Sequence, residues 1–339
     1  MAKWLDYHSA PALQQNLKIA APKRVDSKIV DLNTRLHQQM LRRRTTMSTT
    51  TSAATAITQS ADPCGQALIA HLSEEICRAL HNHEFELHYQ PQINANTGTT
   101  LGAEALIRWV HPQFGLLAPG RFLPLLEAQP ELLDALDHWV INAVCDFIAR
   151  CQARAITLPR LALNLSARQL QNPALAGQIV GILDTTGCRI QPGQLCVEIT
   201  EQSVMPDLET AGRILSELQV MGICSAVDDF GTGYCSMSYL AQLPVSYLKI
   251  DRLFITNALS NHKMRIIIKS IVSMAEAMGL RTITEGVETI EQLVLTLSLG
   301  CEEIQGYLFS RPVPEAEFLS LLQKKASVGP VNWGFQQLV

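Results

Sequence analysis

Apolar runs that each end in a polar side chain recur along this chain. The runs end at Glu104, Asn164, Glu198, Asp228, Lys249, Glu285 and Gln305. Most intervals between these ends have the length of a strand, a helix and two loops, which β/α units fill economically. With one more strand beginning at Phe85, the runs predict about eight strands within residues 63–325. That count fits an α/β fold of the TIM-barrel-like (β/α)8 type, and an open doubly wound sheet is the alternative.

In a barrel, the C-terminal ends of the strands meet on one face, where barrel enzymes place their chemistry. The polar ends would then share one mouth. Together with Asp229, they place five carboxylates there: Glu104, Glu198, Asp228, Asp229 and Glu285. These carboxylates would repel one another, and divalent cations remove that repulsion. All-oxygen ligands with one amide suit Mg²⁺ or Mn²⁺ rather than zinc. Two such ions clamp a phosphoryl group and activate water, with Lys249 to orient that water or stabilise charge.

Two of the carboxylates are adjacent in sequence. The apolar run 223–227 predicts a buried strand, and Asp228 and Asp229 follow where it gives way to a turn containing Gly231 and Gly233. Successive side chains of a strand point to opposite faces, so each aspartate would reach a different metal, or one would bridge both. The alternative interpretation is a solvated strand end in which Asp228 caps a helix.

Composition restricts the class of protein. Hydrophobic residues make up 47% of the 339 residues and charged residues 17%, which is typical of a globular protein. The chain has neither an apolar run of membrane-spanning length nor a signal-peptide core at its N-terminus. Its nine cysteines are odd in number and never form a CxxC pair, which favours reduced thiols over a disulfide framework or a zinc site. We therefore expect a cytoplasmic protein without a transmembrane segment.

The N-terminal part differs from the rest. Residues 1–44 read as a tail with a short amphipathic helix over 24–43, either a dimer seam or a helix lying on the main domain. The Thr/Ser/Ala tract 45–62 predicts a flexible linker, and residues 326–339 form a C-terminal tail. Residues 1–60 carry a net charge of +6, so the remainder carries −10 of the total of −4. Such a basic tail either touches nucleic acid or anionic lipid or is solvated; because no helix-turn-helix or aromatic-interleaved basic stripe accompanies it, we expect no nucleic-acid partner.

Several motifs together resemble one family. They are YQP (89–91), GAEALIRW (102–109), NLSARQ (164–169), EITE (198–201), DDFGTGY (228–234), LKID (248–251), EGVET (285–289) and QGYLFSRP (305–312). In this order, over about residues 66–325, they resemble the EAL domains, the cyclic di-GMP phosphodiesterases of bacteria. The resemblance implies a modified barrel whose first strand runs antiparallel. It also implies hydrolysis of cyclic di-GMP to linear pGpG, which lowers the messenger and so regulates switching between motility and biofilm.

The resemblance also implies roles for individual residues. One metal ion would be held by Glu104, Asn164, Glu198 and Asp228, and the second by Asp228, Asp229 and Glu285. The implied catalytic residues are Glu285 as general-base candidate, Lys249 on the nucleophilic water, and Glu104. The implied substrate contacts are Gln90, Leu106, Arg108 and Gln305, the last also supporting the second metal. Glu201 would hold the loop 230–234, and family members often form homodimers through the region after Asp229.

The chain departs from the family pattern in a few places. Pro130 stands where a glycine is usual in the loop after Phe122, and Thr284 replaces an alanine beside Glu285. Cys235 and Met237 replace a serine and a leucine in the metal loop. None of these changes removes an implied ligand. The alternative function is a non-catalytic cyclic di-GMP receptor or a protein-interaction regulator, although such members typically lack the carboxylates that this chain keeps.

Overall fold

The computed structural model describes residues 74–126, 129–204, 206–232 and 237–326. The expected N-terminal tail with its helix over 24–43, the linker 45–62, and the C-terminal tail from residue 327 on lie outside the described residues. The described part begins with a helical stretch, residues 74–81, that leads into the first strand.

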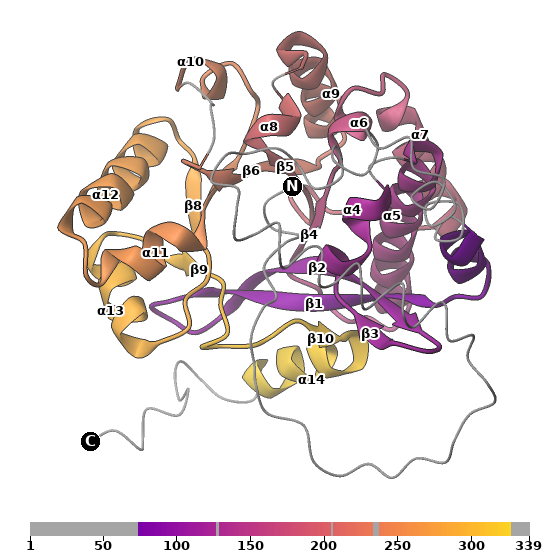
Figure 1. Ribbon diagram of the computed structural model, residues 1–339, viewed down its shortest axis with the longest axis horizontal. Helices are drawn as coiled ribbons and strands as arrows, with labels where there is room; N and C mark the ends of the chain where they lie inside the picture. Colours follow the sequence, from indigo (N-terminus) through magenta and orange to yellow (C-terminus); the bar gives the residue numbers. More distant parts are fainter. Residues whose placement is uncertain (1–73, 127–128, 205, 233–236, 327–339) are drawn as a thin grey trace, which may run out of the picture.

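Eight strands close into a barrel in the order β1-β9-β8-β7-β6-β5-β4-β2, and β2 pairs with β1 to complete the ring (Figure 1). They are β1 (Phe85–Asn94), β2 (Thr100–His111), β4 (Arg160–Asn164), β5 (Leu195–Thr200), β6 (Cys224–Phe230), β7 (Tyr247–Ile250), β8 (Arg281–Thr284) and β9 (Glu303–Ile304). β1 runs antiparallel to both β2 and β9, whereas the other neighbours in the ring are parallel. The predicted barrel with an antiparallel first strand is confirmed, and closure of the ring excludes the open sheet.

A tight turn explains why β1 and β2 are antiparallel. The side-chain oxygen of Asn94 accepts hydrogen bonds from the backbone nitrogens of Asn96 (3.0 Å) and Thr97 (2.9 Å). Gly98 then adopts a positive φ of 70°, which glycine tolerates without steric cost. So short a connection can join only antiparallel strands, because parallel neighbours need a long crossover. Two short strands, β3 (Gly115–Leu117) and β10 (Val313–Pro314), extend the sheet beyond the ring by pairing with β2 and β1.

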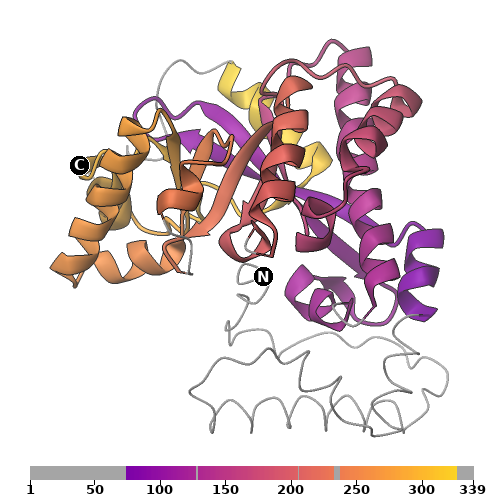
Figure 2. The same ribbon diagram turned by 90° about the horizontal axis from the view of Figure 1, so that it is seen from above.

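Helices surround the barrel, as the two views at right angles show (Figures 1 and 2). The helical elements after β3 are η2 (Pro119–Arg121), α4 (Leu123–Leu126), α5 (Pro130–Ala153), α6 (Ala167–Leu170), α7 (Leu175–Thr186), α8 (Glu201–Val204), α9 (Leu208–Val220), α10 (Met237–Leu240), α11 (Arg252–Ala258), α12 (His262–Ala277), α13 (Ile290–Ser298) and α14 (Glu315–Ala326). Side-chain caps fix several of their starts: Asp207 caps α9, Asp251 caps α11, and Thr289 with Gln292 forms a capping box on α13. Among the helices that the structure describes, none is long and apolar enough to cross a bilayer.

Inside the barrel, side chains form layers because every second residue of a strand points the same way. Two residues before five of the polar strand ends lies a buried cluster made of Ala162, Cys196, Ala226, Tyr247 and Ile283. This mostly small and apolar layer forms a floor beneath the polar residues. Most of the polar side chains at the strand ends above this layer are buried.

Candidate active site

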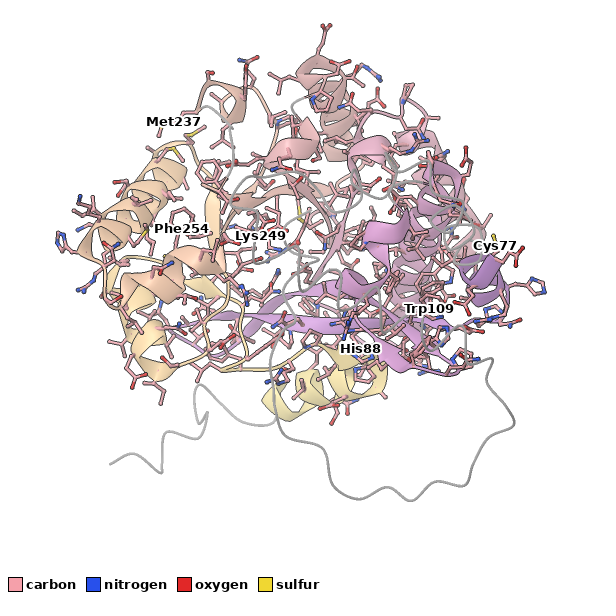
Figure 3. The ribbon with its side chains drawn as sticks, viewed as in Figure 1. Cys77, His88, Trp109, Met237, Lys249 and Phe254 are labelled. Carbon is pink, nitrogen blue, oxygen red and sulfur yellow. The ribbon has the colours of Figure 1, made fainter. Side chains whose placement is uncertain are left out.

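Lys249 lies at the centre of the barrel mouth (Figure 3). Its ammonium nitrogen is 2.8 Å from a carboxylate oxygen of Glu285, 3.4 Å from one of Glu104 and 3.5 Å from one of Asp228, and it also contacts Glu198. The side chain is completely buried. Burial alone would lower the pKa of Lys249, but the surrounding carboxylates hold it well above its usual range. Lys249 is therefore a permanent cation that faces the carboxylates and does not pair with Asp251, whose oxygen instead accepts from Leu253 N.

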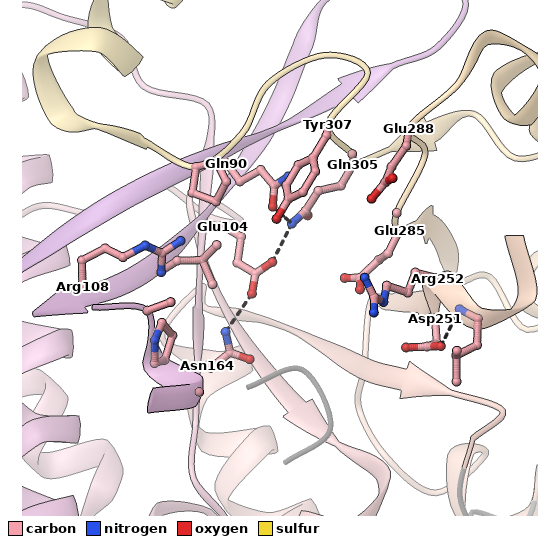
Figure 4. A pocket seen from close by; sticks show the side chains of 18 of the residues that line it. Gln90, Glu104, Arg108, Asn164, Asp251, Arg252, Glu285, Glu288, Gln305 and Tyr307 are labelled. Carbon is pink, nitrogen blue, oxygen red and sulfur yellow. Dashed lines mark hydrogen bonds between the residues drawn. The ribbon is translucent and has the colours of Figure 1, made fainter. Parts of the chain in front are cut away.

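The amide side chains converge on Glu104. Asn164 donates to one Glu104 oxygen (2.8 Å), and Gln305 donates to the other (2.7 Å). Gln305 also donates to the side-chain oxygen of Gln90 (3.0 Å). Figure 4 shows Glu104 between Gln305 and Asn164 at the bottom of a pocket. The structure thus brings together residues from β1, β2, β4 and the segment after β9 that are far apart in the sequence.

Asp228 and Asp229 lie within a strand, whereas the sequence predicted that they lie where a strand gives way to a loop. β6 continues through both residues to Phe230, and its pairing with β7 shifts register between Val227 and Phe230. Asp229 has a φ of 54°, in the left-handed region that aspartate enters more readily than most residues. This irregularity re-aims the Asp229 side chain, so that carboxylate oxygens of Asp228, Asp229 and Glu285 lie within 4.8 Å of one another. The two aspartates therefore share one site instead of pointing to opposite faces.

The donor set of the mouth fits hard divalent cations. Five carboxylates, of Glu104, Glu198, Asp228, Asp229 and Glu285, are buried around the single ammonium group of Lys249. A buried excess of negative charge is costly unless cations offset it. Carboxylate and amide oxygens are the ligands that Mg²⁺ and Mn²⁺ prefer. The cluster of Asp228, Asp229 and Glu285 could hold one ion, and Glu104, Asn164 and Glu198 could hold a neighbouring one.

The pocket lies above these carboxylates. Gln90, Leu106 and Arg108, which the sequence analysis predicted to contact substrate, are among the residues that line it. Arg252 and Tyr307, which the sequence did not single out, also line the pocket; Figure 4 shows Arg108 and Arg252 on opposite sides and Tyr307 beside Gln90 and Gln305. Arg252 directly follows the LKID motif and Tyr307 lies within QGYLFSRP, so the signal was their position beside residues already identified.

Glu201 contacts the segment that follows β6. It begins α8, is buried, and one of its carboxylate oxygens accepts a hydrogen bond from the backbone nitrogen of Gly231 (2.9 Å). Gly231 has a φ of 93°, and a Cβ there would lie 2.7 Å from the ring of Phe254. Glycine is thus required at this position for both backbone and space. Residues 233–236 of the same loop lie outside the described residues.

Comparisons with known proteins agree with this geometry. The EAL domain family matches residues 73–312, so the chain belongs to that family. The bifunctional diguanylate cyclase/cyclic di-GMP phosphodiesterase MucR of Pseudomonas aeruginosa is 37% identical over 249 residues, which is 74% of this chain and 36% of MucR. The cyclic di-GMP phosphodiesterase NbdA of the same organism is 38% identical over 251 residues, or 73% of this chain and 32% of NbdA. The match thus spans about a third of these curated relatives.

Solved structures also match. A structure of the MucR phosphodiesterase in complex with cyclic di-GMP superimposes with a TM-score of 0.69 at 37% identity and covers 73% of this chain and 99% of that one. The EAL enzyme Bd1971 in its cGMP-bound form gives a TM-score of 0.70 at 31% identity and covers 87% of this chain and 76% of that one. The fold described above is therefore that of an EAL domain.

Proposed function

We propose that this chain is a phosphodiesterase that hydrolyses cyclic di-GMP to linear pGpG. The observation that carries the proposal is the buried set of five carboxylates around Lys249, at the bottom of a pocket whose walls contain Arg108 and Arg252. Membership of the EAL family and the names of MucR and NbdA support the choice of substrate. Two Mg²⁺ or Mn²⁺ ions, when bound to Glu104, Asn164, Glu198, Asp228, Asp229 and Glu285, would supply charge neutralisation at the phosphate and activate water.

Side chains of the protein would bind the substrate, transfer the proton and stabilise charge. Arg108 and Arg252 would orient the substrate's phosphates from opposite walls, since guanidinium groups match phosphate geometry. Tyr307 lines the same pocket and would stack on a guanine base. Glu285 lies next to Lys249 and can accept the proton of the attacking water, while Lys249 stabilises negative charge that develops on the phosphoryl oxygens. Gln305 and Asn164 hold Glu104 in one orientation.

The decisive test measures product formation by the full chain with Mg²⁺, with Mn²⁺, and with a chelator. We expect pGpG only with a divalent cation. Glu104→Gln should lower the rate by about 100-fold or more, because it removes a ligand charge and leaves one acceptor oxygen for the two donors Asn164 and Gln305. A matched control is Glu302→Ala, an exposed carboxylate near the other end of the barrel, which should keep the activity.

The same experiment separates the alternative function. A non-catalytic receptor would bind cyclic di-GMP but yield no pGpG over the chelator blank, and that result would reject the enzyme. The carboxylates favour the enzyme, since a receptor has no use for five buried acidic groups that are costly to desolvate. If the chain is active, its expression should lower cyclic di-GMP in a bacterial cell and shift the balance between motility and biofilm.

We further propose a homodimer formed through the region that follows Asp229. Large apolar side chains are exposed there: Met237 on α10, Leu253 on α11, and Ile266 and Ile267 on α12. Contiguous exposed apolar surface marks interaction sites, and these four side chains would contribute to one. Sedimentation at micromolar concentration should show a dimer, and Ile266→Glu should convert it to a monomer. A monomeric wild type would remove the proposal.

The remaining proposals concern organisation. We place the phosphodiesterase domain at residues 63–325, with 1–44 as a tail, 45–62 as a linker and 326–339 as a C-terminal tail, which the family match over 73–312 supports for the barrel. A cytoplasmic location is supported by the cysteines, because the seven that the structure describes are all free thiols.

A further inference from the structure

A second pocket opens at the opposite end of the barrel from the acidic mouth. Its volume is about 520 Å³, and its lining includes Arg160, Cys224, Tyr247 and Arg281. These four residues are the first residues of β4, β6, β7 and β8, so they lie at the N-terminal ends of parallel strands. Tyr247 belongs both to this pocket and to the layer of Ala162, Cys196, Ala226, Tyr247 and Ile283, and no residue that lines the pocket also lines the pocket at the acidic mouth.

Two arginines surround one tyrosine in this pocket. The guanidinium carbons of Arg160 and Arg281 lie 4.1 Å and 4.6 Å from the centre of the Tyr247 ring, and Arg281 also donates to the Tyr247 hydroxyl. Arg160 is buried, whereas Arg281 is exposed at the pocket entrance. Two cations that contact the same ring repel each other, and an anion that binds to both in the pocket would relieve that repulsion.

Space for Arg160 comes from Gly102. A Cβ at this glycine would lie 2.9 Å from a guanidinium nitrogen of Arg160 and 2.6 Å from the side-chain oxygen of Gln92. That oxygen accepts a hydrogen bond of 2.8 Å from Arg160, and Glu303 pairs with the same guanidinium group. The Arg160 side chain is therefore held inside the barrel by Gln92 on β1 and Glu303 on β9.

The charges of the pocket are incompletely balanced. The residues that line it include two arginines and no carboxylate, and Glu303 facing Arg160 leaves one positive charge in excess. Burial alone would lower the pKa of Arg160, but Glu303 holds it above its usual value, so the group stays charged. The Nε of Arg160 is buried and makes no hydrogen bond to any residue in the described part of the chain. Burial also raises the pKa of Tyr247, which keeps its hydroxyl neutral.

We propose that this pocket is a second ligand site, which binds the phosphate group of a small phosphate monoester or free phosphate at Arg281 and Arg160, the two arginines of its lining. Paired guanidinium groups are the usual recognition elements for phosphate oxygens. The volume lies within the range of small-molecule sites and exceeds what one phosphate fills, so an organic substituent fits beside it. The site would bind its ligand without the metal ions that the acidic mouth requires.

Calorimetric titration of the full chain in metal-free buffer tests this, with inorganic phosphate and phenyl phosphate as probes. We expect both to bind, and tighter binding of phenyl phosphate would identify an organic monoester as the ligand class. Arg281→Gln should weaken binding by about tenfold or more, because a charge-assisted hydrogen bond is lost. The matched control Arg189→Gln changes an exposed arginine outside the pocket and should leave the affinity unchanged.

Three outcomes would overturn the proposal. The first is that neither probe binds the wild type with a dissociation constant below about 10 mM, because weaker binding does not indicate a specific site. The second is that Arg281→Gln binds the probes as tightly as the wild type. The third is that Arg108→Gln, in the pocket at the acidic mouth, abolishes binding while Arg281→Gln does not. Thermal unfolding of each variant shows that it is folded. Tyr247→Phe gives an independent check, because it removes only the hydroxyl that holds Arg281 and should weaken binding less than Arg281→Gln.

Discussion

Lys249 determines the electrostatics of the barrel mouth at the level of single residues. An ammonium group without water is as costly to bury as a carboxylate, and each becomes tolerable only beside the other. Here one cation contacts four carboxylates, so it reduces their mutual repulsion but cannot neutralise it. The remaining negative charge is what favours divalent cations at this place.

Replacing Lys249 by methionine tests this balance. Lys249→Met keeps most of the volume but leaves the carboxylates without their cation, so we expect a loss of about 3–5 kcal/mol of unfolding free energy in chelator. Mn²⁺ should restore a large part of that loss, because it supplies the missing positive charge. Urea unfolding with and without Mn²⁺ measures both effects. Lys263→Met, at an exposed position of α12, is the matched control and should cost little; equal losses for the two variants would contradict the argument.

Asp137 on α5 gives a pH dependence of stability. Burial raises the pKa of Asp137 to about 7, against the opposing effect of a hydrogen bond with Ser166; Asp134 raises it further and Arg168 lowers it. The native state therefore holds the proton more tightly than the unfolded chain, so stability should fall by about 2 kcal/mol as the pH rises from 5 to 8. Urea unfolding of Asp137→Asn should lack this part of the slope. If the pH dependence of stability were unchanged in Asp137→Asn, it would arise from other titratable groups.

The strand-end residues were predictable from the sequence because, in a barrel, residues at the C-terminal ends of the strands all lie on the same face. Glu104, Glu198 and Glu285 each end an apolar run, and that pattern alone indicated a shared mouth. Arg160 and Gln92 were not predictable in this way. They interact through the barrel interior at the place where Gly102 leaves room, which depends on strand tilt and register.

At the scale of elements, β6 shows where local reasoning fails. Alternation along a regular strand sends Asp228 and Asp229 to opposite faces, but the left-handed conformation of Asp229 breaks the alternation. A sequence of two aspartates before a phenylalanine carries no signal for that conformation. The structure shows it because the pairing of β6 with β7 skips residues at this point.

The contact between α8 and the end of β6 leads to a prediction about metal binding. Glu201 fixes Gly231, two residues beyond Asp229, so its loss should let Asp229 move away from Glu285. Glu201→Ala should lower Mn²⁺ affinity by about 10- to 100-fold, as expected for removing a group that orients a ligand. Glu201→Gln keeps an acceptor oxygen and should lose much less. Calorimetric titration with Mn²⁺ compares them, and equal affinities for Glu201→Ala and wild type would show that Asp229 is held by other means.

At the scale of the whole molecule, most of the chain carries a net charge of the same sign as the proposed substrate. Residues 61–339 carry a net −10, residues 1–60 carry +6, and cyclic di-GMP is an anion. The β/α spacing that predicted the barrel contains no information on how such distant charges combine. Their range depends on the solvent, because the Debye length is about 8 Å at 0.15 M salt and about 30 Å at 0.01 M.

Salt dependence therefore separates an electrostatic role of the basic N-terminal segment from a specific one. If the segment only offsets the negative barrel, residues 61–339 should show a lower kcat/KM than the full chain at about 0.01 M salt and the same value at about 0.15 M, where distant charges are screened. Turnover of cyclic di-GMP by both proteins, at one saturating Mg²⁺ concentration across the salt series, measures this. A difference that persists at 0.15 M would show that residues 1–60 act through direct contact with the barrel or the substrate, because screening leaves only short-range interactions to account for it.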